Sequence, residues 1–290
     1  MPVLTEQYSF SFAGLTFGGA NSPYQILSVD GLEGLPTMRN QDDNRGYADG
    51  MFSGNDFLSG RSISIILNIF GSGAVSAQEN FNTFQRYILF QRSGTTDLYF
   101  KLPDSPVSEQ FVKARVRGLQ STIDPNYTYG YIVAQVTFFC PDPNIYNSNT
   151  QTATLAYTPP TGRVYNRIYN LEYGGGSVLI TTTITNTGWA TTYPIITLNG
   201  PISNPVIGNS TESAALYFNC LLSSSDDLVI DTYNKLITLN GNPARNTLIS
   251  GSSEWFAAPP GNNSYYLSGT VGSTVIGVTQ ATVEWQSAYI

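Results

Sequence analysis

Residues 186–263 alternate short apolar segments with residues that favour turns. In chain order they contain NTG (186–188), PIITLNG (194–200), PISNP (201–205), DDLVIDT (226–232), NG (240–241) and WFAAPPGNN (255–263). The Asn-Gly pairs at 199–200 and 240–241 are strong turn signals, because both residue types tolerate positive φ angles. Further strands are predicted around them, at 178–184, 215–218, 228–230, 236–239, 265–267 and 275–278. Strands at this spacing indicate a β-sandwich, which buries the inner faces of two sheets.

The N-terminal half also favours strands. Residues 8–12 and 63–69 alternate apolar and polar side chains, which predicts strands with one face on a core and the other toward solvent. Short segments at 98–102 and 112–118, and a longer and more apolar one at 132–139, predict three further strands.

One helix is predicted between these strands. Ser76 and Glu79 have the spacing of a capping box, in which a hydroxyl and a carboxylate bond to backbone amides at a helix start. Apolar side chains then recur at helical spacing, namely Phe81, Phe84, Ile88 and, as a further candidate, Tyr87. This pattern predicts an amphipathic helix over about 77–91 that covers a sheet.

A domain boundary is predicted at CPDPNIY, residues 140–146. Two prolines there interrupt both the hydrogen bonding of a strand and the formation of a helix. We therefore expect a mainly β protein of two domains. Residues 1–146 form a β-sandwich or sheet domain with one helix, and residues 147–290 form the second sandwich, which ends in a strand at 281–290.

The composition excludes several kinds of chemistry. Charged residues make up only 11% of the chain, and the net charge of −7 argues against a nucleic-acid-binding face. The absence of histidine removes the commonest general base and metal ligand. Cys140 and Cys220 are too few for a thiolate zinc site, and we interpret them as small buried hydrophobic residues in different domains. Neither a signal peptide nor an apolar run long enough for a membrane span is predicted.

Two groups of residues could carry chemistry, and each also has a simpler structural role. Asp226, Asp227 and Asp231 offer oxygen ligands of the kind that calcium prefers, but they flank a strand, where carboxylates bond to local amides. We favour the turn role, and expect no metal and no cofactor. The aromatic group could stack on sugar rings or pack in the core, and consists of Trp255, Phe256, Tyr265 and Tyr266. For Trp255 packing is favoured. A hydrolase would need a carboxylate pair at a recognisable motif, and none is found.

The order of Gly, Pro, Asp and Trp in 186–263, together with Asp142-Pro143 and Tyr146, resembles siphophage distal tail proteins. The resemblance implies a galectin-like jelly roll for the C-terminal sandwich and leaves open whether strand 281–290 returns to the first domain. It also implies a structural virion protein, not an enzyme, that assembles in the host cytoplasm and is located at the distal end of a long non-contractile tail. Its N-terminal domain would form a hexameric ring. Expected partners are the tail-tube protein, the tail-tip hub protein and receptor-binding or fibre proteins, with no sequence-specific nucleic-acid binding and no membrane insertion.

The polar stretch 37–50 carries charges of both signs and several glycines, which predicts a long loop or hairpin. We expect this stretch to supply contacts between subunits, and the candidates are Arg39, Arg45, Asp42 and Asp43. The alternative is that it is simply solvated. Two other functions stay open, a carbohydrate-binding adhesin and another component of the tail tip.

Overall fold

A computed structural model describes residues 4–89, 94–103, 109–157, 180–244, 249–270 and 280–290. The chain forms two compact units. Unit 1 is Met1–Asn149 with Tyr289–Ile290, and unit 2 is Thr150–Ala288. In the part of the chain that the structure describes, no helix has the length and apolar character needed to span a membrane.

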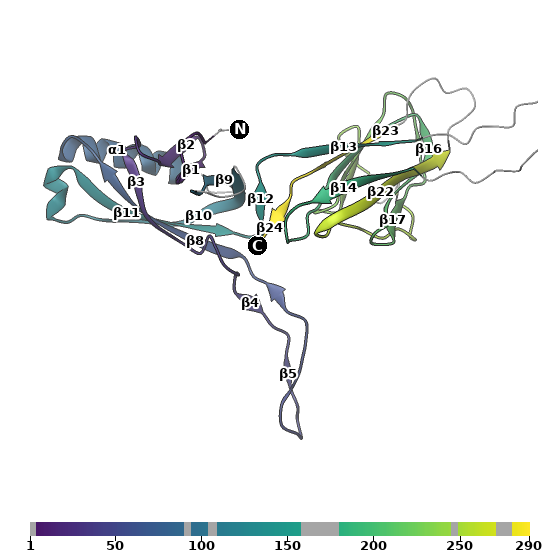
Figure 1. Cartoon of the computed structure of the whole chain (residues 1–290), viewed down its shortest axis with the longest axis horizontal. Helices are drawn as coiled ribbons and strands as arrows, with labels where there is room; N and C mark the ends of the chain where they lie inside the picture. Colours follow the sequence, from purple (N-terminus) through teal and green to yellow (C-terminus); the bar gives the residue numbers. More distant parts are fainter. Residues whose placement is uncertain (1–3, 90–93, 104–108, 158–179, 245–248, 271–279) are drawn as a thin grey trace, which may run out of the picture. The chain divides into compact units, whose positions relative to one another are not determined.

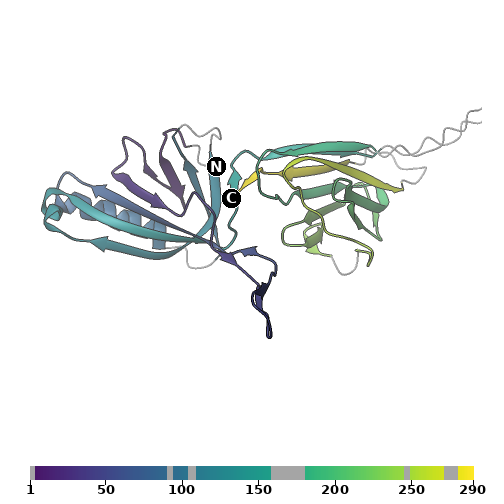
Figure 2. The same ribbon diagram turned by 60° about the horizontal axis from the view of Figure 1, so that its bottom comes forward.

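Unit 1 is built on a continuous sheet (Figures 1 and 2). Among its described residues, seven strands follow one another in the order β2 (Leu15–Gly18), β1 (Ser9–Phe12), β9 (Thr96–Lys101), β10 (Gln110–Thr122), β11 (Tyr131–Cys140), β8 (Arg61–Phe70) and β3 (Tyr24–Asp30). Two short strands, β12 (Ile145–Asn147) and β24 (Ala288–Tyr289), pair with each other, and β12 also pairs with β10. A bulge between Val116 and Gly118 divides the long strand β10. Its first half pairs with β9 and its second half with β11, so both halves of the sheet share one strand.

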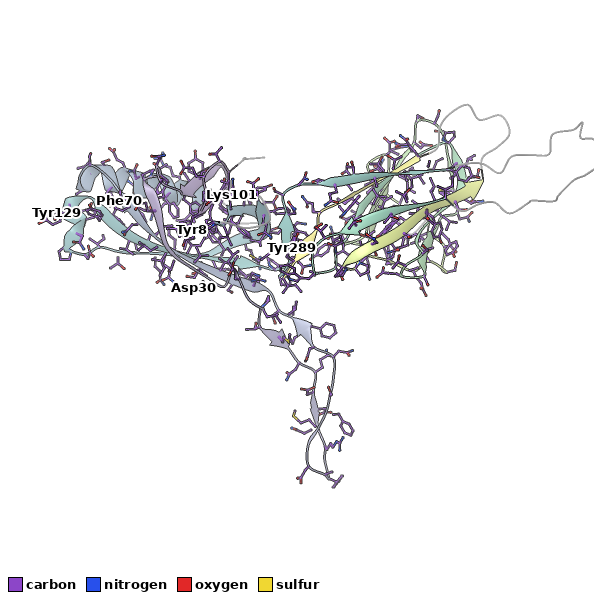
Figure 3. All side chains as sticks on the ribbon, viewed as in Figure 1. Tyr8, Asp30, Phe70, Lys101, Tyr129 and Tyr289 are labelled. Carbon is purple, nitrogen blue, oxygen red and sulfur yellow. The ribbon has the colours of Figure 1, made fainter. Side chains whose placement is uncertain are left out.

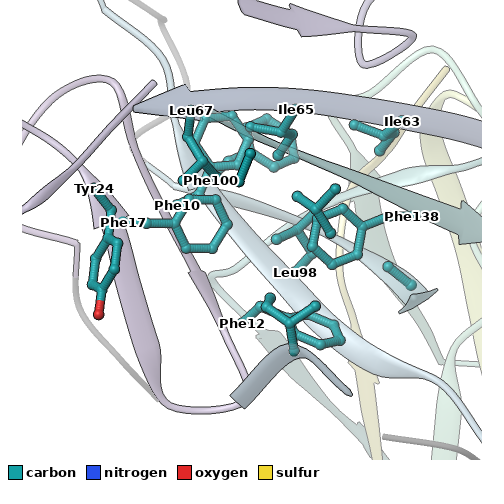
Figure 4. Close-up of a cluster of buried hydrophobic side chains, with 14 of the residues drawn as sticks. Phe10, Phe12, Phe17, Tyr24, Ile63, Ile65, Leu67, Leu98, Phe100 and Phe138 are labelled. Carbon is teal, nitrogen blue, oxygen red and sulfur yellow. The ribbon is translucent and has the colours of Figure 1, made fainter. Parts of the chain in front are cut away.

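The core of unit 1 is rich in phenylalanine (Figure 4). Phe12 from β1 meets Phe138 from β11 edge to face, with ring centroids 5.0 Å apart. The expected alternation is confirmed in β8, where every second side chain is buried. It is wrong for β1, where Ser9 and Ser11 are also buried. Both faces of β1 are therefore buried. A small serine side chain can be buried there because its hydroxyl bonds to nearby backbone, as Ser9 Oγ does to the Glu6 carbonyl.

The helix of unit 1, α1 (Ala74–Leu89), packs on β8 and β11. Phe81, Phe84 and Ile88 are buried as predicted, whereas Tyr87 is 42% exposed. The predicted start was wrong by three residues, because the Gly73 carbonyl already accepts a bond from the Ala77 amide. Ser76 therefore lies inside the first turn and does not cap it. The predicted end at 90–91 falls outside the described residues. A short 3-10 helix, η1 (Pro125–Tyr129), precedes β11.

Unit 2 is the predicted sandwich of two antiparallel sheets. In the described residues the first sheet has the order β13 (Gln151–Ala156), β23 (Gln280–Trp285), β15 (Ile195–Asn199), β19 (Asp227–Asp231), β20 (Leu236–Leu239) and β21 (Asn242–Pro243). The second has the order β14 (Thr181–Asn186), β22 (Gly261–Thr270), β16 (Ile202–Asn209) and β17 (Ala214–Tyr217), with β18 (Leu221–Leu222) also on β16. Alternate side chains of both sheets form one apolar core. The predicted strand at 275–278 and the start of the one at 178–184 lie outside the described residues.

The end of the chain differs from the single strand predicted at 281–290. It is divided into β23, which pairs with β13 and β15, and β24, which pairs with β12. Gln286 and Ser287 separate the two strands. Ser287 is fully buried, and its hydroxyl accepts a bond from the Thr187 amide, so the chain bends there instead of continuing the ladder.

The polar stretch after β3 forms a hairpin that projects from the sheet of unit 1 (Figure 1). It carries two short ladders, β4 (Met38–Arg39) with β7 (Phe57–Leu58), and β5 (Asp43–Asn44) with β6 (Met51–Phe52). The hairpin form of the sequence prediction is therefore confirmed. We call residues 37–57 the arm.

Candidate functional site

The arm is the most exposed part of the described chain. Every residue from 37 to 57 is exposed, and the side chains stand free of the sheet (Figure 3). Its large apolar side chains are Met38, Tyr47, Met51, Phe52 and Phe57. Exposed apolar side chains gathered on one element indicate an interaction surface, because burying them in a folded monomer would stabilise it.

The four residues expected to make contacts between subunits all lie on the arm. The guanidinium of Arg39 lies 5.7 Å from the ring centroid of Phe57, and that of Arg45 lies 5.1 Å from the ring centroid of Phe52. At these distances the cation is attracted to the ring face, which holds both arginines along the arm. Their role between subunits stays a prediction.

The two aspartates of this group bond to arm backbone. Asp42 Oδ1 accepts a hydrogen bond from the Gly54 amide at 2.9 Å, which joins the two sides of the hairpin. Asp43 Oδ1 accepts one from the adjacent Asn44 amide. Asp42 Oδ2 also accepts a 3.5 Å bond from the Asn40 side chain. Part of the hydrogen-bonding capacity of each carboxylate is therefore used within the arm, and both residues are exposed.

A buried arginine anchors the root of the arm. Arg61 begins β8 directly after the arm and is only 2% exposed. Its Nη1 donates to the carbonyls of Gly31, Leu32 and Gly34, at 3.1, 2.6 and 3.0 Å. Its Nε donates to the Pro143 carbonyl at 3.1 Å. One guanidinium thus ties the segment before the arm and the end of unit 1 to β8.

Burial also changes the acidity of this region. Loss of hydration lowers the pKa of Arg61, and the same cause raises the pKa of the neighbouring Cys140 thiol to about 12. Cys140 is therefore a neutral buried side chain at physiological pH. Cys220 is also a free thiol, and it lies in unit 2. The expected burial is confirmed for Cys140, whereas Cys220 is only partly buried against the core of unit 2.

The Pro-Asp-Pro segment has a specific structural basis. Asp142 is buried, its Oδ2 accepts a 2.6 Å bond from the Tyr146 hydroxyl, and its Oδ1 accepts one from the Asn144 amide. A buried carboxylate requires such partners because it has lost its hydration. Asp142 and Tyr146 therefore fix the turn between β11 and β12.

The three aspartates of unit 2 bond to local amides and hydroxyls. Asp226 accepts bonds from the amide and hydroxyl of Ser223 and from the side chain of Asn240. These bonds stabilise the charged form and hold the pKa of Asp226 at about 2. Asp227 accepts from Asn199, and Asp231 accepts from Asn234. The turn role is confirmed for Asp226 and Asp231, whereas Asp227 lies in β19 and bonds to its cross-strand neighbour. In the described ranges, no three acidic, cysteine or histidine residues are grouped as a metal site would require.

The aromatic residues that could have stacked on sugar rings are mostly core. Tyr265 is 0% exposed and donates its hydroxyl to the Ala257 carbonyl, and Phe256 packs edge to face against it. Trp255 is partly buried against the same core. Rings with covered faces cannot stack on a sugar, so the packing interpretation is the correct one for Phe256 and Tyr265.

Buried asparagines, which the sequence did not single out as a group, hold the loops of the sandwich. Asn186 donates to the carbonyls of Ala190 and Ala258 and accepts from the amide of Gly188. Asn209 donates to Asn263, which in turn donates to the Pro259 carbonyl. Two of these three side chains are members of the segments NTG and WFAAPPGNN. The sequence signal of the sandwich therefore coincides with its buried loop anchors.

Comparison with solved structures shows which proteins share this fold. The structure of the SPP1 Dit protein (gp 19.1), described as a paradigm of the hub adsorption apparatus in phages that infect Gram-positive bacteria, aligns with a TM-score of 0.67 at 14% identity. The alignment covers 98% of this chain and 99% of that one. Two structures of the phage P2 baseplate in its activated conformation, with Ca and with Sr, align with TM-scores of 0.51 and 0.50. Their identities are 13% and 12%, and they cover 98% and 97% of this chain and 98% of each of those chains.

Part of the sequence also matches a family model. Residues 187–289 match the family described as siphovirus-type tail component, C-terminal domain. The comparison with curated proteins found no match. The family match over residues 187–289 and the shared fold together confirm the expected resemblance to siphophage distal tail proteins.

Proposed function

We propose that the chain forms a hexameric ring at the distal end of a long non-contractile tail. Unit 1 makes the ring, and the ring joins the tail tube to the tail-tip hub. Unit 2, a galectin-like sandwich, is available to receptor-binding or fibre proteins. The role is structural and needs no catalytic group or cofactor.

The observation that carries this proposal is the arm. A ring needs two different patches on each subunit that meet when the subunits are related by rotation. An arm that projects from unit 1, with exposed apolar and charged side chains, is a natural first patch. Its two arginines stay exposed and are positioned by aromatic rings, which leaves guanidinium donors available to a neighbour's carboxylates.

The direct test is the size and symmetry of the purified protein and of a variant. We expect wild-type protein to give sixfold rings by negative-stain microscopy and a hexamer mass by light scattering. The double variant Arg39→Glu/Arg45→Glu should lose the rings while keeping its far-UV circular dichroism. A matched control, Arg86→Glu/Lys235→Glu, makes the same charge change at exposed positions on α1 and in unit 2.

The outcomes separate two levels of the proposal. Intact rings in the arm variant would show that Arg39 and Arg45 make no essential contact. A wild-type protein that stays monomeric both in solution and when mixed with tail tubes would overturn the ring itself.

A further inference from the structure

A second charged surface of unit 1 lies beside the root of the arm. Arg115 and Arg117 from β10 both place their guanidinium groups over one ring, that of Phe139, at 5.5 and 5.1 Å from its centroid. Arg117 is the residue at the bulge between Val116 and Gly118, and Arg115 lies opposite Phe139 in the ladder with β11. Lys113 is exposed on the same strand. We call Arg115, Arg117 and Phe139 the arginine patch.

The patch has unused hydrogen-bonding capacity. Nε of Arg115 is buried and has no hydrogen-bond partner in the described structure. Within the described residues, neither Arg115 nor Arg117 makes a side-chain hydrogen bond or an ion pair, and both guanidinium groups contact the ring of Phe139. Two like charges held at one ring without a counter-ion repel each other, and a carboxylate placed between them would relieve this repulsion and accept from both.

The arginine patch lies next to the root of the arm. Phe139 pairs with Ser62 in the ladder of β11 and β8, directly after the arm ends. Its ring lies on Gly60, where an added Cβ would come within 2.6 Å of Cζ. The patch and the arm root are therefore neighbours, while the arm itself projects away from them.

The arm carries a net negative charge, which is opposite to that of the arginine patch. Residues 37–57 contain four aspartates and two arginines, a net charge of −2. Each side of the arm is an extended strand of about ten residues, which spans roughly 33 Å. The tip of the arm therefore lies too far from the arginine patch of its own subunit to contact it. That length exceeds the radius of gyration of about 15 Å expected for a domain of 150 residues, so an arm can cross to the next subunit.

We infer that the arginine patch of one subunit receives the aspartates of the arm of a second copy of this chain. This rests on the proposed ring and names the surface that completes its interface. The arm and the patch are different surfaces of the same unit, as a heterologous interface requires. Aromatic and cationic groups occur on both sides, and the opposite charges of the arm aspartates and the patch arginines favour this pairing over arm with arm or patch with patch.

The test uses charge reversal in two variants. The patch variant is Arg115→Glu/Arg117→Glu, which changes the patch from two positive to two negative charges. The arm variant is Asp49→Lys/Asp56→Lys, which changes the arm from −2 to +2. These aspartates are chosen because the carboxylates of Asp42 and Asp43 accept hydrogen bonds from arm backbone, whereas those of Asp49 and Asp56 make no side-chain hydrogen bond in the described residues. Arg86→Glu/Lys235→Glu is again the control.

Each variant alone is expected to lose the ring, and an equimolar mixture is expected to restore it. When the two variants alternate around the ring, each acidic arm meets a basic patch and each basic arm meets an acidic patch. Native mass spectrometry should therefore show hexamers with three copies of each variant. Restoration also proves that both variants fold. If the patch variant does not fold, Arg115→Gln/Arg117→Gln takes its place, with at least a tenfold rise in the concentration needed for half-assembly.

Other outcomes overturn the inference in distinguishable ways. Rings that persist in either single variant would overturn the pairing but leave the proposed ring intact, and the patch would then belong to another tail protein. Variants that stay monomeric in the mixture would show that charge complementarity is not the cause of the loss. A wild-type protein that forms no ring would overturn the proposed function and this inference with it.

Discussion

Replacing Arg61 with alanine should loosen the arm root and destabilise unit 1 without affecting unit 2. Arg61 is buried and donates to four carbonyl oxygens, which belong to Gly31, Leu32, Gly34 and Pro143. These acceptors come from segments far apart in the sequence, so no local structure replaces the arginine. The loss therefore acts on the packing of unit 1 and on the direction of the arm.

The size of the effect follows from the surroundings of each acceptor. Gly31 and Gly34 are exposed, and water can replace the arginine there. Leu32 is buried and Pro143 is partly buried, and leaving a buried acceptor unpaired costs about 1–3 kcal/mol. Removing the guanidinium also removes its own unfavourable burial, seen in its lowered pKa and in the unpartnered Nη2. We expect a net loss of about 3 kcal/mol from these opposing effects, within the range for breaking a buried charged network.

The assay uses the positions of the tryptophans. All three, Trp189, Trp255 and Trp285, lie in unit 2, so tryptophan fluorescence follows the unfolding of that unit. Far-UV circular dichroism follows both units. With a urea dependence of about 2 kcal/mol per molar, a loss of about 3 kcal/mol moves the unit 1 midpoint down by about 1.5 M. The fluorescence midpoint should not change.

The control is Arg61→Lys. An ammonium keeps the charge and can donate to the carbonyls before the arm, but it lacks the planar fork that also reaches Pro143. About half of the lost stability should return, and hydrogen exchange at residues 31–34 should slow relative to the alanine variant. Unchanged midpoints in the alanine variant would refute the role of Arg61 as an anchor, as would an equal shift of both signals.

Three further predictions concern the other polar contacts. Asn186→Ala removes a side chain with four buried hydrogen bonds, which should lower the free energy of unfolding of unit 2 by about 2–4 kcal/mol. The urea midpoint of tryptophan fluorescence should fall, and the dichroism transition of unit 1 should not change. Tyr146→Phe leaves one oxygen of buried Asp142 without its donor and should lower the free energy of unfolding of unit 1 by about 1–3 kcal/mol. The unfolding transition measured by dichroism should shift, and the one measured by tryptophan fluorescence should not. The pKa of Asp226 is about 2 in the folded state, below its unfolded value, so its contribution is present above about pH 4 and is lost as pH falls toward 2. Asp226→Asn should flatten the acid dependence of the fluorescence midpoint in that window, and an unchanged slope would contradict the assignment.

The sequence predicted those elements whose pattern repeats. The period of two in β8 and the apolar spacing of α1 could be predicted, because in each element the apolar residues recur at the spacing that places them on one buried face. The start of α1 could not, because the turn before it depends on contacts with a distant segment. Gly71 donates to the Gly130 carbonyl and packs against the first turn, which leaves Ser76 inside the helix. A capping motif is local, and here a tertiary contact overrides it.

The candidate site was harder to predict than the fold for a related reason. Arg39 and Arg45 could be chosen because they stand in a stretch that no core can use. Arg61 could not be recognised as an anchor, since its four acceptors are backbone carbonyls, which every residue carries. Arg115 and Arg117 have the ordinary alternation of a strand, and the sequence does not show that the ring of Phe139, from another strand, lies beside both.

The segments that carry the family resemblance and the surfaces proposed for assembly are under different physical constraints. Asn186 and Asn263 make several buried hydrogen bonds each, and no other side chain of that size offers the same donors and acceptors at the same place. Such positions give a sequence a recognisable pattern. An exposed arm needs only strand propensity and a charge that suits its partner, which many sequences supply. The arm therefore has to be recognised by its exposure and charge in the folded protein, and the pairing of its aspartates with the arginine patch follows from that surface and from no motif.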